Sequence, residues 1–246
     1  MIEPDRLSLQ LYTVRADLDR DGEGTIARIA EIGFRQVEPF GLVERGPRLA
    51  DLLRTHDLTA PTSHAHVIGA ELEPVLDTAV QLGVTTVIEP YVDPERWRTA
   101  EGVEQIAVQL NQIADRAGER GIAIGYHNHH FELESVIEGR HALELFAERL
   151  APSVRLELDT YWAAAGGADV LALLGRLGER VAALHIKDGD RTLDPKAQVA
   201  VGAGSMPVAE ILAAAPGRLA VVELDDFAGE MFDAVSDSYA YLQAAA

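Results

Sequence analysis

Residues 125–134 carry an unusual density of side chains that can bind metal ions or move protons. They read Gly-Tyr-His-Asn-His-His-Phe-Glu-Leu-Glu, with three histidines and two carboxylates. The short apolar run 122–124 precedes them, which predicts that they begin at the end of a β-strand. Imidazole nitrogens and carboxylate oxygens are common ligands of divalent cations, so this stretch predicts a metal site.

Three further apolar runs each lead into a residue that can bind a divalent cation. The runs are 154–158, 181–184 and 219–222, and the residues that follow are Asp159, His185 and Glu223. Carboxylates gathered at one place repel each other and raise one another's pKa unless a cation neutralises them. Three carboxylate oxygens and one imidazole nitrogen suit Mn²⁺, Mg²⁺, Co²⁺ or Zn²⁺, with positions left open for substrate oxygens.

The composition predicts one acidic domain without nucleic-acid or membrane partners. The chain has 246 residues, 48% of them hydrophobic, and we expect a single domain over residues 1–246. Forty acidic residues against 21 basic ones give a formal charge of -19, which repels nucleic acid and anionic membranes. Because there is no cysteine, any metal must be held by nitrogen and oxygen. The amino terminus lacks the pattern of a secretory signal and no apolar run approaches about 18 residues, so we expect a soluble cytoplasmic protein.

Short apolar runs alternate with longer amphipathic segments along the chain. The strand candidates are 7–12, 35–39, 58–64, 85–89, 122–127, 154–159, 181–186 and 219–223. The clearest helical pattern covers 101–120, where apolar residues recur at three- and four-residue steps. Eight strand–helix units in about 250 residues predict an α/β fold, a single (β/α)8 TIM barrel, whose active site lies at the carboxyl ends of its strands. A doubly wound sheet is less favoured because no Gly-x-Gly-x-x-Gly follows the first strand.

Each predicted strand ends on or near a polar residue. These residues are Gln10, Glu38, His64 and His66, Glu89, His127 with Glu132, Asp159, His185 with Lys187, and Glu223. A lone histidine near a strand end is more often a hydrogen-bonded structural residue. The occurrence of such residues at all eight ends favours a shared site at the mouth of the barrel.

Several motifs in order along the chain resemble those of the xylose isomerase-like TIM barrels. This family includes sugar phosphate isomerases and epimerases, ketose 3-epimerases and inosose dehydratases. The motifs lie at 9–15, 31–38, 126–129, 131–132, 158–162, 184–189, 201–204 and 221–223. The resemblance spans nearly the whole chain and implies the same barrel fold.

The resemblance also implies a metal centre and its ligands. In such families Glu, Asp, His and Glu from the later strands hold the ion, and these carry over to Glu132, Asp159, His185 and Glu223. Mn²⁺ is the first expectation for the ion, with Mg²⁺, Co²⁺ and Zn²⁺ as alternatives. The first ligand is open, because the ketose epimerases keep a glutamate on the strand itself where this chain reads Tyr-His-Asn-His. Glu134, His127 or His129 can therefore take the place of Glu132.

The expected chemistry is proton transfer next to a carbonyl group. A metal that chelates a carbonyl and an adjacent hydroxyl acidifies the carbon-bound proton and stabilises the enediolate. Glu132 and Glu223 are the expected proton carriers, which gives isomerisation or epimerisation. General acid help is expected from His127, His129 or Lys187.

Substrate contacts are expected from His64, Tyr161, Trp162 and Arg191. Lys187 and Arg191 are the cations expected near the site, where they can hold a hydroxyl, carboxylate or phosphate group. Aromatic residues follow the strands at Tyr12, Phe40, Tyr91, Trp97, Tyr161 and Trp162. Tyr161 and Trp162 are the two expected to cover a sugar ring, and packing against the barrel is expected for the others. Gly202-x-Gly204 is a weak phosphate loop and more typical of a tight turn before a helix that starts near Pro207.

The leading hypothesis is a divalent-metal-dependent isomerase or epimerase of a sugar or keto-sugar. The alternative is a lyase on the same site, either an inosose-type dehydratase or an enzyme that eliminates across a 3-keto-glycoside. Trp162 favours it modestly, since the ketose epimerases have a histidine there. Related barrels that cleave DNA at abasic sites need a basic face, and the charge of -19 argues against one. A non-catalytic sugar-binding barrel is the remaining class, and homo-oligomerisation is suggested by analogy.

Overall fold

The computed structural model describes residues 2–244 and contains a ring of eight parallel strands. The strands are β1 (Leu7–Gln10), β2 (Gln36–Glu38), β3 (Thr62–His64), β4 (Thr86–Glu89), β5 (Ala123–His127), β8 (Val154–Asp159), β9 (Val181–Ile186) and β12 (Leu219–Val222). Their order in the sheet is β2-β1-β12-β9-β8-β5-β4-β3. All neighbouring pairs in this order are parallel, as the alternation of the sequence predicts.

The ring is nearly closed between β2 and β3. A parallel bridge joins Gln36 to Thr59, just before β3. The amide of Val37 donates to the Thr59 carbonyl at 2.9 Å, and the amide of His64 donates to the Pro39 carbonyl at 2.8 Å. The prediction of a (β/α)8 barrel is therefore confirmed.

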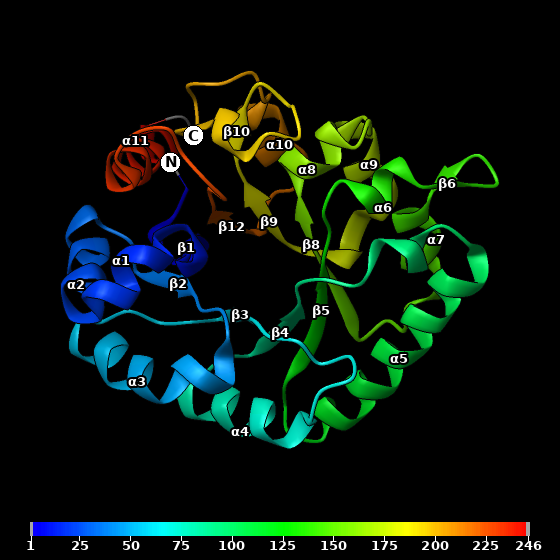
Figure 1. Cartoon of the computed structure of the whole chain (residues 1–246), viewed down its shortest axis with the longest axis horizontal. Helices are drawn as coiled ribbons and strands as arrows, with labels where there is room; N and C mark the ends of the chain where they lie inside the picture. The colour runs from blue at the N-terminus through cyan, green and yellow to red at the C-terminus, as the bar shows by residue number, and fades with distance from the viewer. Residues whose placement is uncertain (1, 245–246) are drawn as a thin grey trace.

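Helices surround the strands on the outside of the ring (Figure 1). They are α1 (Arg15–Arg20), α2 (Gly22–Ile32), α3 (Leu42–Thr55), α4 (Leu72–Leu82), α5 (Ala100–Gly118), α6 (Phe131–Glu134), α7 (Ala142–Arg149), α8 (Thr160–Ala165), α9 (Val170–Leu177), α10 (Val208–Ala214) and α11 (Met231–Ala244). The helix predicted over 101–120 is α5, whose residues Val103, Ile106 and Leu110 are fully buried. Within residues 2–244, no helix combines the length and hydropathy needed to cross a bilayer.

Six of the eight strand predictions were too long, and two of them by two residues or more at one end, each for a local reason. Strand β1 ends at Gln10, because the Gln10 side chain accepts a hydrogen bond from the Tyr12 amide at 3.1 Å and starts a short 3-10 helix. The strand predicted over 58–64 is reduced to Thr62–His64, because Pro61 has no amide hydrogen to continue the ladder. Both changes leave the polar end of the strand at the mouth of the barrel.

Asp188 organises the loop that precedes α10. Its carboxylate accepts hydrogen bonds from the amides of Gly202, Gly204 and Met206 at 2.9, 3.1 and 2.9 Å. The loop is thus the tight turn that the sequence predicts, and these three amides already have an anionic partner within the protein. Asp188 itself belongs to a short hairpin, β10 (Asp188–Gly189) with β11 (Gln198–Val199), that the sequence did not indicate.

Gly202→Ala is expected to destabilise the protein by about 1–3 kcal/mol. Gly202 has a φ of 93°, and a Cβ there would lie 2.2 Å from a ring carbon of Tyr241. Gly175→Ala is the matched control, because Gly175 lies inside α9 with no atom within 4 Å of an added Cβ. This control is expected to stabilise the helix slightly. Urea unfolding of both variants checks the difference, and equal stability of the two would contradict the prediction.

Candidate metal centre

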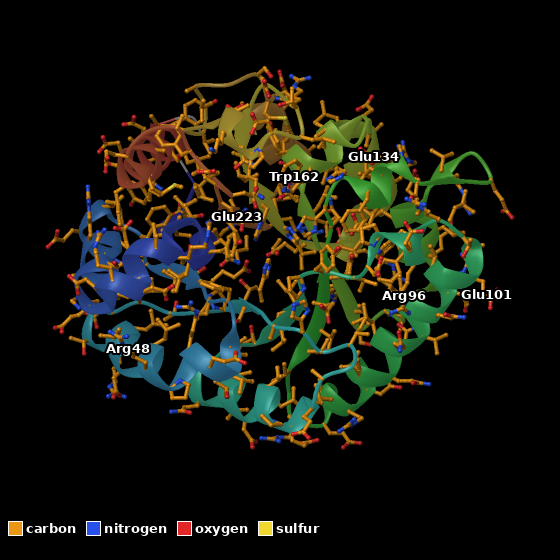
Figure 2. All side chains as sticks on the ribbon, in the orientation of Figure 1. Arg48, Arg96, Glu101, Glu134, Trp162 and Glu223 are labelled. Carbon is orange, nitrogen blue, oxygen red and sulfur yellow. The ribbon has the colours of Figure 1, made fainter. Side chains whose placement is uncertain are left out.

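Four buried side chains meet at the carboxyl ends of neighbouring strands. His127 ends β5, Asp159 ends β8, His185 lies near the end of β9, and Glu223 follows β12. Each offers a ligand atom, and these four atoms all lie within 4.8 Å of one another. Figure 2 shows Glu223 pointing into the centre of the ring. Two nitrogens and two oxygens in one buried group form a donor set that can hold a divalent metal ion.

Buried oxygen atoms without hydrogen-bond donors support this interpretation. Asp159 Oδ2 is buried and accepts no hydrogen bond, although Lys187 Nζ lies 2.9 Å away and His127 Nε2 lies 3.9 Å away. Burial raises the pKa of Asp159 to about 6, against the attraction of Lys187 and His185. A cation bound beside Oδ2 would relieve this cost of desolvation.

Lys187 is a positively charged side chain beside Asp159 and two further carboxylates. Its Nζ lies 2.9 Å from Asp159, 2.8 Å from Glu223 and 2.6 Å from Asp225. Burial alone would lower the pKa of Lys187, but attraction to these three carboxylates holds that pKa well above its ordinary value. Lys187 is therefore charged and fully occupied by carboxylates.

Glu132 lies outside this group. Its carboxylate accepts hydrogen bonds from Tyr126 Oη at 2.6 Å and from the His129 amide at 2.9 Å. Burial raises the pKa of Glu132 to about 8, in spite of these hydrogen bonds. Among the predicted ligands the structure brings together Asp159, His185 and Glu223, and it adds His127, one of the open alternatives for the first ligand.

A second carboxylate, Glu157, lies one layer deeper in the barrel. Its Oε2 lies 2.7 Å from His64 Nε2, 3.0 Å from His185 Nε2 and 3.1 Å from His127 Nδ1. With these three histidines it forms a further group of ligand-type atoms within 4.8 Å of one another. A carboxylate that holds the far nitrogen of a histidine fixes the orientation of the ring and the tautomer that faces a metal.

Glu38 is the second carboxylate beside Nε2 of His185. Its Oε1 lies 2.8 Å from His185 Nε2 and accepts a hydrogen bond from Gln10 Nε2 at 2.7 Å. Burial and the nearby charge of Glu157 raise the pKa of Glu38. Because Nε2 of His185 faces these two carboxylates, its Nδ1 is the nitrogen on the side of Glu223, at 2.7 Å from Oε2.

The pattern of polar residues at strand ends included Glu38 but not Glu157. Alternation along β8 places Glu157 on the same face of the strand as Asp159, because side chains two residues apart point to the same side. Since Asp159 faces the barrel interior, that period of two was the signal for Glu157. The role of Asp225, which follows β12 by three residues, had no such pattern.

A cavity of about 730 Å³ opens above the candidate metal centre. Its polar end includes His64, His127, His129, Glu223 and Asp225. Burial, and then repulsion from Lys187, lowers the pKa of His129 to about 4, so the ring is neutral at neutral pH. His129 Nδ1 is buried and has no hydrogen-bond partner among the described residues. The His129 ring lines the cavity and is therefore placed beside a bound ligand.

Three of the four predicted substrate contacts, Tyr161, Trp162 and Arg191, do not line this cavity. Tyr161 is fully buried, and its hydroxyl donates to the Thr192 carbonyl at 3.0 Å. The Trp162 ring centroid lies 5.4 Å from Lys187 Nζ, and Arg191 is exposed and donates to the Ser205 carbonyl. His64 is the predicted substrate contact that lines the cavity, together with Tyr12, Phe40 and Tyr91, for which packing was expected.

The eight-stranded barrel and its buried His–Asp–His–Glu group define a TIM barrel with a candidate metal centre at the mouth. The chain belongs to the xylose isomerase-like TIM barrel family, whose model matches residues 26–215. None of the curated proteins compared matches the chain.

Solved structures confirm the fold over nearly the whole length. A sugar phosphate isomerase/epimerase from Parabacteroides distasonis ATCC 8503 is 24% identical with a TM-score of 0.84, covering 97% of this chain and 93% of that one. The 3-keto-D-glucoside 4-epimerase YcjR from E. coli is 16% identical with a TM-score of 0.73, covering 97% of this chain and 99% of that one. The IOLI protein with a binding zinc atom is 17% identical with a TM-score of 0.72, covering 98% of this chain and 97% of that one.

Glu157→Gln is expected to lower metal affinity about 10–100-fold, because three histidines lose the carboxylate that orients them. Isothermal titration with Mn²⁺ and with Zn²⁺ measures the change. Glu101→Gln is the control, since Glu101 is exposed on α5 at the periphery (Figure 2). Equal affinities of both variants and the wild type would rule out this role for Glu157.

Glu132→Gln is expected to flatten the pH dependence of stability. The pKa of Glu132 rises from 4.5 to about 8 on folding, so the folded chain retains a proton that the unfolded chain has released. The contribution of this group to the free energy of unfolding is therefore present below pH 4.5 and is lost as the pH rises to about 8. Urea unfolding across this range, with a chelator present, compares the wild type with Glu132→Gln and with the exposed control Glu134→Gln. If the free energy of unfolding changes with pH in the same way for all three proteins, Glu132 ionises with its ordinary pKa and the prediction is wrong.

Proposed function

We propose that this protein is a divalent-metal-dependent isomerase or epimerase of a sugar or keto-sugar. The observation that carries the proposal is the buried group of His127, Asp159, His185 and Glu223 beside a cavity of about 730 Å³. Family membership and the similarity to the Parabacteroides sugar phosphate isomerase/epimerase and the E. coli 3-keto-D-glucoside 4-epimerase support it. The lyase alternative rests on Trp162, whose ring lies 5.4 Å from Lys187 Nζ and outside the cavity lining.

His127, Asp159, His185 and Glu223 would hold the ion. When bound, a divalent cation supplies Lewis-acid stabilisation of the negative charge that develops on the substrate oxygens. Mn²⁺ is the first ion to test, because it accepts oxygen and imidazole ligands and leaves positions open. Zn²⁺ is the second, since the IOLI protein binds it.

Glu223 and His129 are the side chains that we assign to proton transfer. Both line the cavity. The ionised form of Glu223 is favoured, because Lys187 and His185 outweigh burial and hold its pKa well below the ordinary value. His129 is neutral, with a pKa of about 4, and its ring lines the cavity, where it would exchange a proton with the substrate. Glu132 then acts as a positioning residue, because it holds the His129 amide at 2.9 Å.

Lys187 keeps the carboxylates ionised and in place. Its three ion pairs compensate Asp159, Glu223 and Asp225 at distances from 2.6 to 2.9 Å. It therefore limits the net negative charge that the ion and the substrate oxygens meet.

Asp159→Asn is expected to lower both metal content and turnover, the latter by about 100-fold or more. The assay incubates the protein and Mn²⁺ with a panel of ketoses and keto-sugars in D₂O. An isomeric product that has gained one deuterium reports proton transfer through solvent. Metal content is measured in parallel by mass spectrometry.

Glu134→Gln is the control for this variant, because Glu134 is exposed on α6 and lies outside both groups of ligand-type atoms. Full metal content and full turnover of Asp159→Asn would contradict the assignment of the centre. Loss of water from the substrates, in place of deuterium gain, would support the lyase instead.

A further inference from the structure

The cavity extends well beyond the candidate metal centre. From the polar end it runs over the start of α3 and the start of α4, where Leu42, Val43, Pro74 and Val75 line it. Its volume of about 730 Å³ lies within the range of about 300–1,000 Å³ typical for drug-sized ligands. A single sugar ring on the metal would leave this outer part unfilled.

The outer part is walled by apolar and aromatic side chains. Phe40 lines the cavity, with its ring centroid 5.3 Å from that of Tyr12 in an edge-to-face arrangement. Tyr91 lines the cavity as well and packs edge-on against His129 at 5.8 Å. Tyr12 and Tyr91 are large side chains that remain 39% and 46% exposed. Exposed aromatic faces at the edge of a cavity favour ligands that carry an apolar or ring-shaped group.

The charges around the cavity are unsuited to phosphate. Its lining includes the carboxylates of Glu44, Glu71, Glu223 and Asp225 and no lysine or arginine. A phosphate group placed in this part of the described structure would meet these four carboxylates and neither a lysine nor an arginine. His66, which also lines the cavity, is held by Glu89 at 2.7 Å, so its positive charge is compensated whenever it is protonated.

The arginines next to the aromatic wall are engaged elsewhere. Arg45 lies with Cζ 4.4 Å from the Phe40 ring centroid and donates to Asp19 Oδ1 at 2.6 Å. Arg15 lies 4.1 Å from the Tyr12 ring and donates to the carbonyls of Tyr12 and Asp225. Neither guanidinium lines the cavity. The loop of 202–206, which the sequence offered as a weak phosphate loop, is occupied by Asp188.

We propose that the substrate is an uncharged sugar or keto-sugar that carries an apolar substituent, and that this substituent binds the outer cavity between α3 and α4. The proposal rests on the proposed function for the deep end and adds a subsite for an aryl or alkyl group. Free sugar phosphates are then poor ligands. If the substituent is attached at the anomeric carbon, the ring cannot open, and proton transfer must occur beside a carbonyl within the ring.

Binding of matched glycosides tests the subsite separately from turnover. Isothermal titration of the Mn²⁺-loaded protein compares phenyl and methyl β-D-glycosides of glucose and galactose, with glucose 6-phosphate as the charged probe. For at least one of the two sugars, the phenyl glycoside is expected to bind about 10–100-fold more tightly than the methyl glycoside, the range that burial of one phenyl ring gives. Glucose 6-phosphate is expected to bind more weakly than both.

Two valine variants test whether the preference for the phenyl glycoside arises in the outer cavity. Val43→Asp places a carboxylate in the outer cavity and is expected to abolish the phenyl preference, and the protein should still fold because Val43 is 38% exposed. Val80→Asp is the matched control on α4, since Val80 is 53% exposed and lies outside the cavity lining. This control is expected to keep the preference.

Several results would overturn the subsite. They are equal binding of phenyl and methyl glycosides, binding of glucose 6-phosphate as the tightest ligand, no glycoside binding at all, or an unchanged preference in Val43→Asp. A phenyl preference without deuterium exchange on any keto-sugar would instead count against the proposed function and leave the subsite in place.

Discussion

The balance between buried carboxylates and cations at the mouth of the barrel is the constraint on which the rest of the structure depends. Glu38, Glu157, Asp159 and Glu223 are all buried, and removal from water opposes the ionised form of each. His64, His185 and Lys187 supply the opposing cations at distances of 2.7–3.1 Å, because attraction to the carboxylates raises the pKa of each in spite of burial. Asp159 Oδ2 still lacks a hydrogen bond in this arrangement. A bound divalent cation would complete the balance, which is why we place the metal centre here.

The barrel makes this concentration of charge possible. Parallel strands of one ring present their carboxyl ends on the same side, so residues far apart in the chain become neighbours. His185 and Glu38 are 147 residues apart and lie 2.8 Å from each other. The surrounding helices bury the apolar faces of the strands, and that packing keeps the polar layers in a fixed geometry. Two carboxylate layers result. Glu223 lines the cavity and shares Lys187 with the buried Asp159, while Glu38 and Glu157 hold the histidines.

Much of this arrangement could be predicted from the sequence, because the informative patterns are local. Alternating apolar runs and amphipathic segments indicated eight strand–helix units, and the polar residues at strand ends indicated which end carries the site. Predictions that needed the direction of a side chain were less complete. Glu132 stands in the histidine-rich stretch but turns toward Tyr126 and the His129 amide. Tyr161 and Trp162 follow Asp159 by two and three residues, yet they lie at the start of α8 and outside the cavity lining.

The sequence by itself determined the barrel fold, the family resemblance, and three of the four side chains in the candidate metal centre, Asp159, His185 and Glu223. It could do so because strand periodicity and strand ends depend on neighbouring residues. Only the tertiary structure decided that His127 joins this group, that Glu157 supports it, and that the cavity extends along α3 and α4. These features depend on rotamers, on burial and on distances between strands that are remote in the chain. Such distances follow from the closure and packing of the whole barrel, which no local pattern encodes.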